Sequence, residues 1–301
     1  MVHFCRMKIP YYHVDVFTET AFSGNGLSVF LPPHELSAAQ MQRITQEMLQ
    51  FESVFVRPRA AETLLRSAEP AETLVDARVF TVEEELAFAG HPSLGAAAQL
   101  HERYKPEEAE ARWVFLYPTK TLPVVTRRTD FGYACTMDQG KAVFGEPLTQ
   151  TQQRPILEVM GWTSEDLDPR YPLQVVSTGL PYLLVPLKRN FTTAPIGAKG
   201  LSEKLTEAGA KFIGLVDVDG RSMRTGDNAG RVEDIATGSL AGPVGAYLVR
   251  HGAAKRGEEI VITQSAHLGR ESHLYVTVTD EVHVRGGVVL LAEGWLRIPK
   301  G

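Results

Sequence analysis

The sequence predicts an α+β protein made of two related halves with mostly antiparallel sheets. A strand–turn–helix pattern occurs twice, once around Gly90 and again around Gly238. Much of the remaining chain consists of short alternating or β-branched segments separated by turn residues, which is typical of antiparallel strands. The length of 301 residues suits two domains of ordinary size. No Gly/Ser-rich linker separates the halves, so the repeat alone places the boundary near Met137.

The first copy of the pattern, Leu86–Leu100, is an apolar strand end followed by a small-residue turn and an Ala-rich helix. Pro92 suits the first helical turn, where its missing N–H costs nothing. Gly90 lets the backbone approach a bound group closely. Free N–H groups and the positive end of the helix dipole then face the turn, so we expect an anion-binding site there.

The second copy is Glu233–Leu248, and superposition places Gly238 on Gly90 and Ser239 on His91. Glycine-rich turns between a strand and a helix are common in proteins without any site there, so either copy alone is a weak signal. Two copies, each with a polar side chain directly after the glycine, indicate a functional site.

Composition and charge exclude several classes of protein. The 44% hydrophobic and 22% charged residues are ordinary for a soluble protein, and the net charge of −5 with scattered Lys and Arg gives no basic surface for nucleic acid. Two cysteines, Cys5 and Cys135, exclude a disulfide scaffold. No signal peptide or membrane span is predicted, so we expect a cytoplasmic protein. An alternative start at Met7 would make residues 1–6 a dispensable extension.

The first elements lead to two candidate site residues. Tyr12–Phe17 is expected to be a strand, and Ser37 to cap a helix with Gln40 as its capping-box partner. Between them, Gly24-Asn25-Gly26 is either a simple tight turn or a turn that holds the Asn25 amide at the edge of a site.

Glu52 follows in a predicted strand, where alternation places it on one face with Val54 and Val56. A carboxylate that shares a strand face with apolar side chains has two explanations. It is an edge-strand charge that prevents aggregation, or it is a general acid/base. Desolvation by Phe51, Val54 and Phe55 would raise its pKa toward neutrality, as a proton shuttle requires.

The remaining elements of the first half follow in order. Residues 59–76 are expected to be loop with short strand character, and the acidic run Glu83–Glu85 a solvated loop or a helix start. The strands expected around the Gly90 helix are Arg78–Thr81, Trp113–Tyr117, Leu122–Arg127 and Phe131–Met137.

The second half contains three expected helices and a series of strands around its own glycine turn. The helices are residues 151–160, 164–167 and 197–208, and 221–230 is expected to be a polar loop. The strands are residues 173–178, 182–187, 212–218, 260–264, 273–279, 282–284, 287–291 and 294–298.

Common catalytic and cofactor motifs are missing. The chain has no dinucleotide-binding glycine fingerprint, Walker loop, zincin motif or nucleophile elbow. His267 and His273 lack the accompanying ligand spacing of a metal site, so no metal is expected. Glu52, His91, Asp234 and Ser239 remain. They favour proton transfer without a cofactor, in which helix N-termini hold a carboxylate and stabilise negative charge beside it.

Several motifs, in this order, resemble a known family. They are Asp15-Val16-Phe17-Thr18 with Gly24-Asn25, Glu52–Val56, Arg78–Thr81, Ala89–Pro92, Val232–Ser239, and Gln264 with Gly269-Arg270. Together they resemble the PhzF-like isomerases of phenazine biosynthesis, which share the diaminopimelate-epimerase fold. The likeness covers nearly the whole chain.

The resemblance implies two similar domains, each a sheet wrapped around a central helix, with the active site in the cleft between them. The domains would be residues 1–136, to which strand 288–301 returns, and residues 137–287. The family commonly forms homodimers and uses no cofactor, and its phenazine member isomerises a dihydro-hydroxyanthranilate.

By position, the resemblance also implies a role for each candidate residue. Glu52 corresponds to the general acid/base, and His91 and Asp234 to groups that orient it and relay protons. Ser239 and the Gly90 and Gly238 backbones correspond to the groups that bind the substrate carboxylate.

Several residues differ from the family pattern, which limits how much of the family's function can be assigned to this chain. The related epimerases use two opposed cysteines, but those positions are Ala89 and Thr237 here, so a two-thiol racemisation is excluded. Gly26, Val82 and Ile235 each replace a proline, and Phe51 replaces a small polar residue. Phe51 is expected to point away from Glu52 and to affect packing. The departures leave the pocket shape and the substrate open.

Two rival functions differ from the isomerase. A catalytically idle binder of small carboxylates would have the same cleft, but would not need an acid/base carboxylate in an apolar setting. A nucleotide-dependent oxidoreductase would need the dinucleotide fingerprint that the chain lacks.

Overall fold

The computed structural model describes residues 6–59 and 72–299, so residues 1–5 and most of the loop expected at 59–76 lie outside the described residues. The chain divides into two compact units. Unit 1 is Met1–Met137 with Gly286–Gly301, and unit 2 is Asp138–Arg285. Each unit is described by itself. The domain boundaries expected from the sequence, 136/137 and 287/288, stay a prediction.

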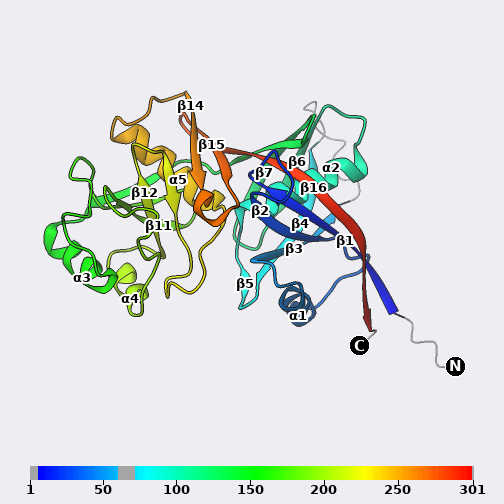
Figure 1. The fold of residues 1–301 in the computed structure, drawn as a ribbon. Coiled ribbons are helices and arrows are strands. Elements are labelled where there is room, and N and C mark those ends of the chain that lie inside the picture. The colour runs from blue at the N-terminus through cyan, green and yellow to red at the C-terminus, as the bar shows by residue number, and fades with distance from the viewer. Residues whose placement is uncertain (1–5, 60–71, 300–301) are drawn as a thin grey trace. The chain divides into compact units, whose positions relative to one another are not determined.

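The strands of unit 1 form a closed ring. Along the ring they follow the order β1-β2-β3-β4-β6-β7-β8-β16, and β16 pairs again with β1. The first and last strands, blue and red in Figure 1, therefore lie side by side. The strands are β1 (Arg6–Val16), β2 (Asn25–Phe30), β3 (Glu52–Pro58), β4 (Thr73–Thr81), β5 (Glu85–Leu86, paired with β4), β6 (Glu110–Leu116), β7 (Thr121–Thr129), β8 (Gly132–Asp138) and β16 (Val282–Pro299).

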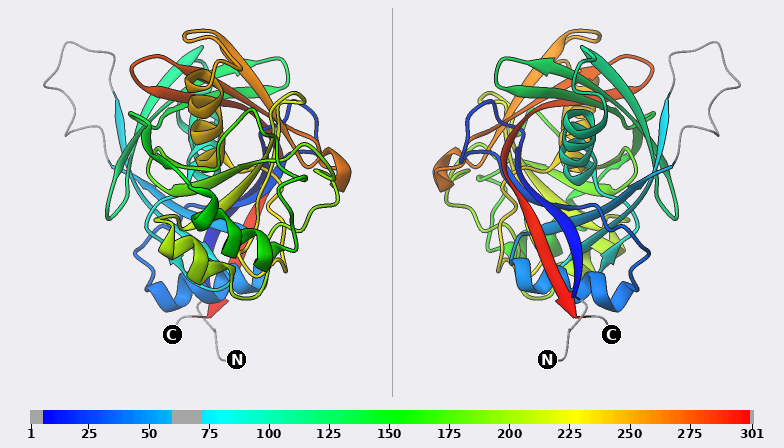
Figure 2. Two further views of the ribbon diagram at one scale, coloured as in Figure 1. Left: turned by 90° about the vertical axis from the view of Figure 1, so that its left-hand side faces the viewer. Right: turned by 90° about the vertical axis from the view of Figure 1, so that its right-hand side faces the viewer.

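Helix α2 (Gly90–Tyr104) runs through this ring (Figure 2). Its residues from Gly90 to His101 are all buried, and most of them are small. A Cβ atom at Gly95 would lie 2.5 Å from Leu27 Cδ2 and 2.9 Å from Val14 Cγ2. Small residues therefore let the helix fit inside a ring that larger side chains would force open.

Helix α1 (Ala38–Met48) covers the outer face of the same strands. Ser37 and Gln40 form the expected capping box. Met41 and Ile44 pack against Phe55 and other large apolar side chains of β2 and β4. Strand β3 is thus buried on both faces and paired with β2 and β4, so Glu52 does not lie on an edge strand.

Unit 2 curves its sheet around α5, which contacts β10, β11, β14 and β15. The strand order is β9-β10-β11-β12-β13-β14-β15-β16. The elements are β9 (Val143–Pro147), α3 (Gln150–Met160), β10 (Gln174–Ser177), β11 (Pro181–Pro186), α4 (Leu201–Glu207), β12 (Phe212–Asp217), β13 (Ser222–Arg224), α5 (Gly238–Arg250), β14 (Glu259–Gln264), the 3₁₀ turn Ala266–Leu268 and β15 (Ser272–Val278).

The repeat seen in the sequence extends to the topology. In unit 1, α1 connects the parallel strands β2 and β3, and α2 lies between the parallel strands β4 and β6. In unit 2, α4 connects the parallel strands β11 and β12, and α5 lies between β13 and β14. The other strand pairs described are antiparallel, which confirms the predicted α+β class with mostly antiparallel sheets.

Three local expectations were wrong. Residues 164–166 form a turn and Leu167 an isolated β-bridge instead of a helix, and the expected loop 221–230 contains β13. The three expected C-terminal strands are one continuous strand, β16. The expected break at residues 285–286 contains Gly286, where a Cβ atom would lie 2.3 Å from Phe17 Cδ1.

In the described part of the chain, no helix has the length and apolar character needed to span a membrane.

The packing of α2 generates a test of the fold. We expect Gly95→Ala to lower the free energy of unfolding by about 1–3 kcal/mol, because the added methyl group overpacks the contact with Leu27 and Val14. Helix propensity alone predicts the opposite, a gain of about 1 kcal/mol. Chemical denaturation of the wild type and of Gly95→Ala decides between the two expectations. A variant more stable than the wild type would contradict the packing argument.

Candidate functional site

Glu52 and His91 form a buried contact in unit 1. Glu52 is the first residue of β3 and His91 the second residue of α2. His91 Nδ1 lies 3.0 Å from Glu52 Oε2, with 4% and 8% of the two side chains exposed. The strand start and the helix start therefore bring together two residues that are far apart in sequence.

Burial determines the state of His91. It lowers the pKa of His91 to about 3, so the imidazole is neutral at physiological pH. A neutral imidazole has one N–H, and Nδ1, which faces the carboxylate, is the nitrogen that donates. Nε2 is then an acceptor, and no group in the described residues hydrogen-bonds to it.

A chain of hydroxyl groups supports the turn before His91. Ser93 Oγ donates to the Ala89 carbonyl at 2.8 Å, and Tyr117 Oη lies 2.6 Å from Ser93 Oγ. Burial, with a smaller contribution from the negative charge of Glu52, raises the pKa of Tyr117, so this phenol stays protonated. Tyr117 therefore donates to Ser93, and the chain of hydroxyls fixes the carbonyl that precedes Gly90.

Asn25 lies at the same end of the ring. It is the first residue of β2, is 2% exposed, and pairs with Val16 on β1. Because side chains alternate along a strand, Asn25 shares the face of Leu27, which packs against α2. Its neighbour Gly24 has φ +65°, and a Cβ there would lie 2.4 Å from the Val16 carbonyl oxygen.

Asp234 and Thr237 form the corresponding turn in unit 2. Thr237 Oγ1 donates to Asp234 Oδ2 at 2.5 Å, and Asp234 is 7% exposed. Gln264 holds the turn from β14, since its Oε1 accepts from Thr237 N at 2.9 Å and its Nε2 donates to the Asp234 carbonyl at 2.7 Å. The position of the Asp234 carboxylate is thus fixed by hydrogen bonds.

Gly238 and Ser239 begin α5. Ser239 Oγ lies 2.8 Å from Tyr182 Oη on β11. Gln139 Nε2 donates to the Gly238 carbonyl at 2.9 Å, and Thr178 Oγ1 donates to Gln139 Oε1 at 2.7 Å. Sequence analysis missed Gln139 and Tyr182, because both are single polar residues far from the turn that they support.

The two central helices have uncapped N-termini. No side chain caps α2 or α5, whereas Ser37 caps α1 and Thr149 caps α3. No side chain therefore occupies the positive dipole ends of these two helices, and the anion site expected there stays a prediction.

Each unit also braces its turn with an Arg–Glu pair that sequence analysis missed. Arg78 makes two hydrogen bonds to Glu85 at 2.7 and 2.6 Å. Arg224 makes two to Glu233, each 2.7 Å long. Both glutamates stand five residues before the helix glycine, so superposing the two copies aligns them, but the arginines stand at different distances from the glycines and do not align. Glu85 was expected in a solvated loop or helix start, but it lies in β5.

The structure thus brings Glu52, His91 and Gly90 together in unit 1, with Asn25 on a neighbouring strand. It brings Asp234, Gly238 and Ser239 together in unit 2. The repeat equivalent of Glu52, the first residue of β12, is Phe212. Phe51 is 37% exposed, and its expected effect on packing stays a prediction.

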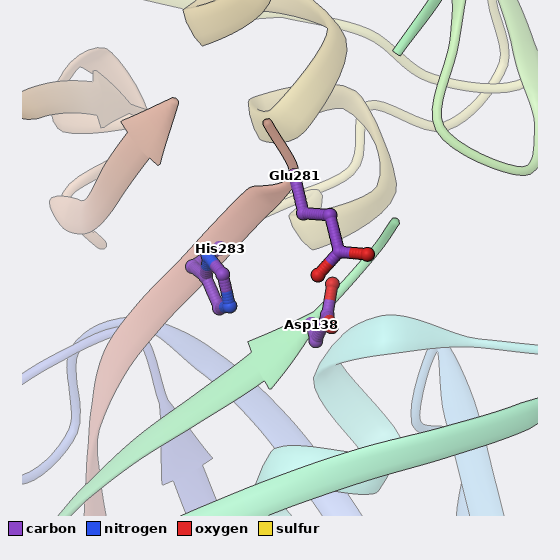
Figure 3. Close-up of side chains that lie close together, drawn as sticks. All are labelled: Asp138, Glu281 and His283. Atoms are coloured by element: carbon purple, nitrogen blue, oxygen red, sulfur yellow. The ribbon is translucent and has the colours of Figure 1, made fainter. Parts of the chain in front are cut away.

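One group of side chains could hold a metal ion. The ligand atoms of Asp138, Glu281 and His283 in unit 2 lie within 4.8 Å of one another (Figure 3). Glu281 is exposed and the other two are half-buried, and we assign no metal to them. His267 and His273 contact different carboxylates, Glu233 and Glu271.

Comparison with known proteins places this chain among isomerases. Residues 14–294 match the family model described as phenazine biosynthesis-like protein. The uncharacterized isomerase YddE of Escherichia coli (strain K12) is 30% identical over 95% of this chain and 97% of its own. The trans-2,3-dihydro-3-hydroxyanthranilate isomerase of Pseudomonas aeruginosa is 30% identical over 94% of this chain and 98% of its own.

Solved structures give the same result. A protein described as a predicted epimerase from Pseudomonas aeruginosa is 43% identical, has a TM-score of 0.86, and is matched over 96% of this chain and 99% of its own. A hydroxyproline epimerase from Agrobacterium vitis, 12% identical with a TM-score of 0.63 over 98% of this chain and 94% of its own, shares the fold. The chain is therefore an isomerase of the PhzF family with a diaminopimelate-epimerase-like fold.

Proposed function

We propose that the protein moves a proton between two carbon atoms of a small carboxylate, with Glu52 as the only general acid/base and without a cofactor. The observation that carries this proposal is the buried contact between Glu52 and a neutral His91. Glu52 removes a proton from one carbon and returns it to another. The His91 Nδ1–H bond holds the carboxylate in place during both steps.

The electrostatics of the turns support this role. Removing a proton from carbon leaves negative charge that spreads toward the substrate carboxylate. Uncapped helix N-termini at Gly90 and Gly238 would bind that carboxylate and stabilise the developing charge. Asn25 and Ser239 would complete substrate binding, and Asp234 would assist proton relay.

The names of the relatives narrow the range of possible substrates. One relative is named for trans-2,3-dihydro-3-hydroxyanthranilate, a cyclic carboxylate. We propose that a compound of this general type is the substrate, and that the protein acts on small-molecule carboxylates, with no nucleic acid or membrane partner. The homodimer and the cytoplasmic location expected above stay predictions.

The role of Glu52 is tested by solvent exchange. We expect Glu52→Gln to lower deuterium incorporation from D₂O into trans-2,3-dihydro-3-hydroxyanthranilate and other unsaturated carboxylates at least ~100-fold, because no other base replaces it. Mass spectrometry of the products measures the exchange. The exposed neighbour variant Glu84→Gln is the matched control and should exchange normally. Undiminished exchange by Glu52→Gln would remove Glu52 as the base.

The neutral state of His91 predicts how stability depends on pH. Its pKa in the folded protein is about 3, below the ordinary value of 6.5. The unfolded chain therefore binds a proton first, and stability is lost as pH falls from about 6.5 toward 3. The loss is at most about 1.4 kcal/mol per pH unit.

His91→Gln removes this titrating group, so its stability should fall less steeply over the same range. Denaturation curves at several pH values compare the two proteins. Equal slopes for the wild type and the variant would show that His91 is not held neutral.

Carboxylate binding in unit 2 is tested at Ser239. We expect Ser239→Ala to weaken binding of a substrate carboxylate by about 1–3 kcal/mol, since a hydrogen bond to a charged group is lost. Tyr182→Phe, which removes only the hydroxyl that contacts Ser239, should have a smaller effect. Calorimetric titration gives both affinities, and an unchanged affinity for Ser239→Ala would place the anion site elsewhere.

A further inference from the structure

A pocket of about 240 Å³ lies in unit 2 beside the C-terminal end of α3, which is green in Figure 1. We call it the α3 pocket. Three of the residues that line it are buried members of the core of unit 2, Met160, Leu187 and Ala194. Trp162, partly buried against the same core, lines it as well. An apolar cavity of about 150 Å³ binds benzene, so the α3 pocket has room for a branched side chain and a polar group.

Asp166 gives this pocket a negative charge. Its Oδ2 accepts hydrogen bonds from Thr163 N at 2.8 Å and from Thr163 Oγ1 at 3.0 Å. These bonds lower the pKa of Asp166, so the carboxylate is ionised at neutral pH. Within the described part of the chain, no hydrogen bond reaches its other oxygen, Oδ1. That oxygen can therefore accept from a ligand.

Arg189 lines the same pocket with a positive charge. Among the described residues its one ion pair is with Glu165, where Nη1 lies 3.5 Å from Oε2 and the two side chains are 63% and 78% exposed. Surface pairs of this kind contribute little to stability, so the guanidinium can exchange Glu165 for a ligand carboxylate. The side-chain amide of Asn190, the next residue, makes no hydrogen bond to the described residues.

The two charges come from neighbouring segments. The Asp166 carbonyl accepts from the backbone N–H groups of Lys188 and Arg189, at 2.8 and 3.4 Å. Helix α3 ends at Met160, and its cap Gly161 also lines the pocket. The negative end of the helix dipole therefore adds to the charge of Asp166. The α3 pocket thus presents one negative and one positive group beside an apolar floor.

Backbone contacts hold the loop that carries Arg189 and Asn190. Asn190 has φ 56°, a left-handed conformation that asparagine tolerates. Its carbonyl accepts from Thr193 N at 3.0 Å and Ala194 N at 2.7 Å. From β13, Arg224 donates to the Phe191 carbonyl at 2.5 Å and the Ala194 carbonyl at 2.9 Å. These bonds hold the loop in place without a ligand, which reduces the entropy lost on binding.

We propose that the α3 pocket binds a free α-amino acid with an apolar side chain of about the size of leucine. The ammonium group binds Asp166 and the end of α3, the carboxylate binds Arg189 and Asn190, and the side chain packs on the apolar floor. A ligand with a single charge leaves the opposite group of the pocket without a partner. This site goes beyond the proposed function, because none of its residues belongs to unit 1 or to the turn before α5.

Calorimetric titration with four compounds tests each contact separately. We expect L-leucine to bind with a Kd of about 1 mM or below. 4-Methylpentanoate lacks the ammonium group, 3-methylbutylamine lacks the carboxylate, and glycine lacks the side chain. Each of the three should bind at least ~tenfold more weakly than leucine, since each loses one contact.

The indole N–H signals report where leucine binds. The chain has three tryptophans, of which Trp113 and Trp295 lie in unit 1 and Trp162 in unit 2. Trp295→Phe and Trp162→Phe assign the three signals in proton–nitrogen correlation spectra. Leucine should shift the Trp162 signal and leave the other two in place.

Two variants remove one charge each. Arg189→Gln and Asp166→Asn should each weaken leucine binding at least ~tenfold, and Arg189→Gln should keep its Tm within about 2 °C of the wild type. Arg154→Gln on α3 is the matched control, because it also removes an exposed arginine from a weak pair, with Glu158 at 3.7 Å. It should bind leucine as the wild type does.

Three outcomes would overturn the proposal: no binding of leucine by the wild type, equal binding of 4-methylpentanoate, or full affinity in Arg189→Gln. Leucine is itself a small carboxylate, so Ser239→Ala separates the α3 pocket from the turn before α5. That variant should bind leucine normally. Binding lost in Ser239→Ala and kept in Arg189→Gln would place the amino acid at the turn instead. The titrations measure no turnover, so their result does not depend on the role of Glu52.

Discussion

The close approach of one small-residue helix to the strands around it is the constraint on which unit 1 depends. The closed ring leaves room for α2 only because Gly95 presents no side chain to Leu27 and Val14. The same packing sets the depth of the helix N-terminus. His91 reaches Glu52 because the start of the helix and the start of β3 lie at one end of the ring. The contacts that pack α2 into the core therefore also set the geometry of the site.

That arrangement carries an electrostatic cost that the surrounding groups reduce. Burying a carboxylate and an imidazole removes both from water, which is unfavourable unless each is hydrogen-bonded. Keeping His91 neutral avoids a second buried charge, and its N–H satisfies one carboxylate oxygen. The hydroxyl chain from Tyr117 through Ser93 to the Ala89 carbonyl stabilises the turn itself. These hydrogen bonds hold the groups in place without a ligand, an arrangement that favours catalysis by preorganised groups.

The sequence predicted the fold class and the internal repeat because both leave local patterns. Gly90 and Gly238 start helices, and the capping box at Ser37 starts another. Long-range partners left no such pattern. Gln139 and Tyr182 support the second turn through contacts that only the folded chain creates.

Errors arose where a strand is interrupted by glycine or is very short. The break expected at residues 285–286 lies inside β16, where Gly286 closely approaches Phe17. The short strand β13 was missed because three residues are too few to show alternation.

The difference between the two repeats says more about the type of reaction than their likeness does. Both units keep the uncapped helix, the Arg–Glu brace and the glycine turn, so the framework proposed to bind an anion is common to the two. Only unit 1 has a carboxylate at the strand start, where unit 2 has Phe212. A reaction that inverts a carbon centre with two opposed bases needs one base from each repeat. If Glu52 is the only base, as proposed, the proton that it removes returns from the same side, and a shift of the proton between carbons satisfies that requirement where inversion does not.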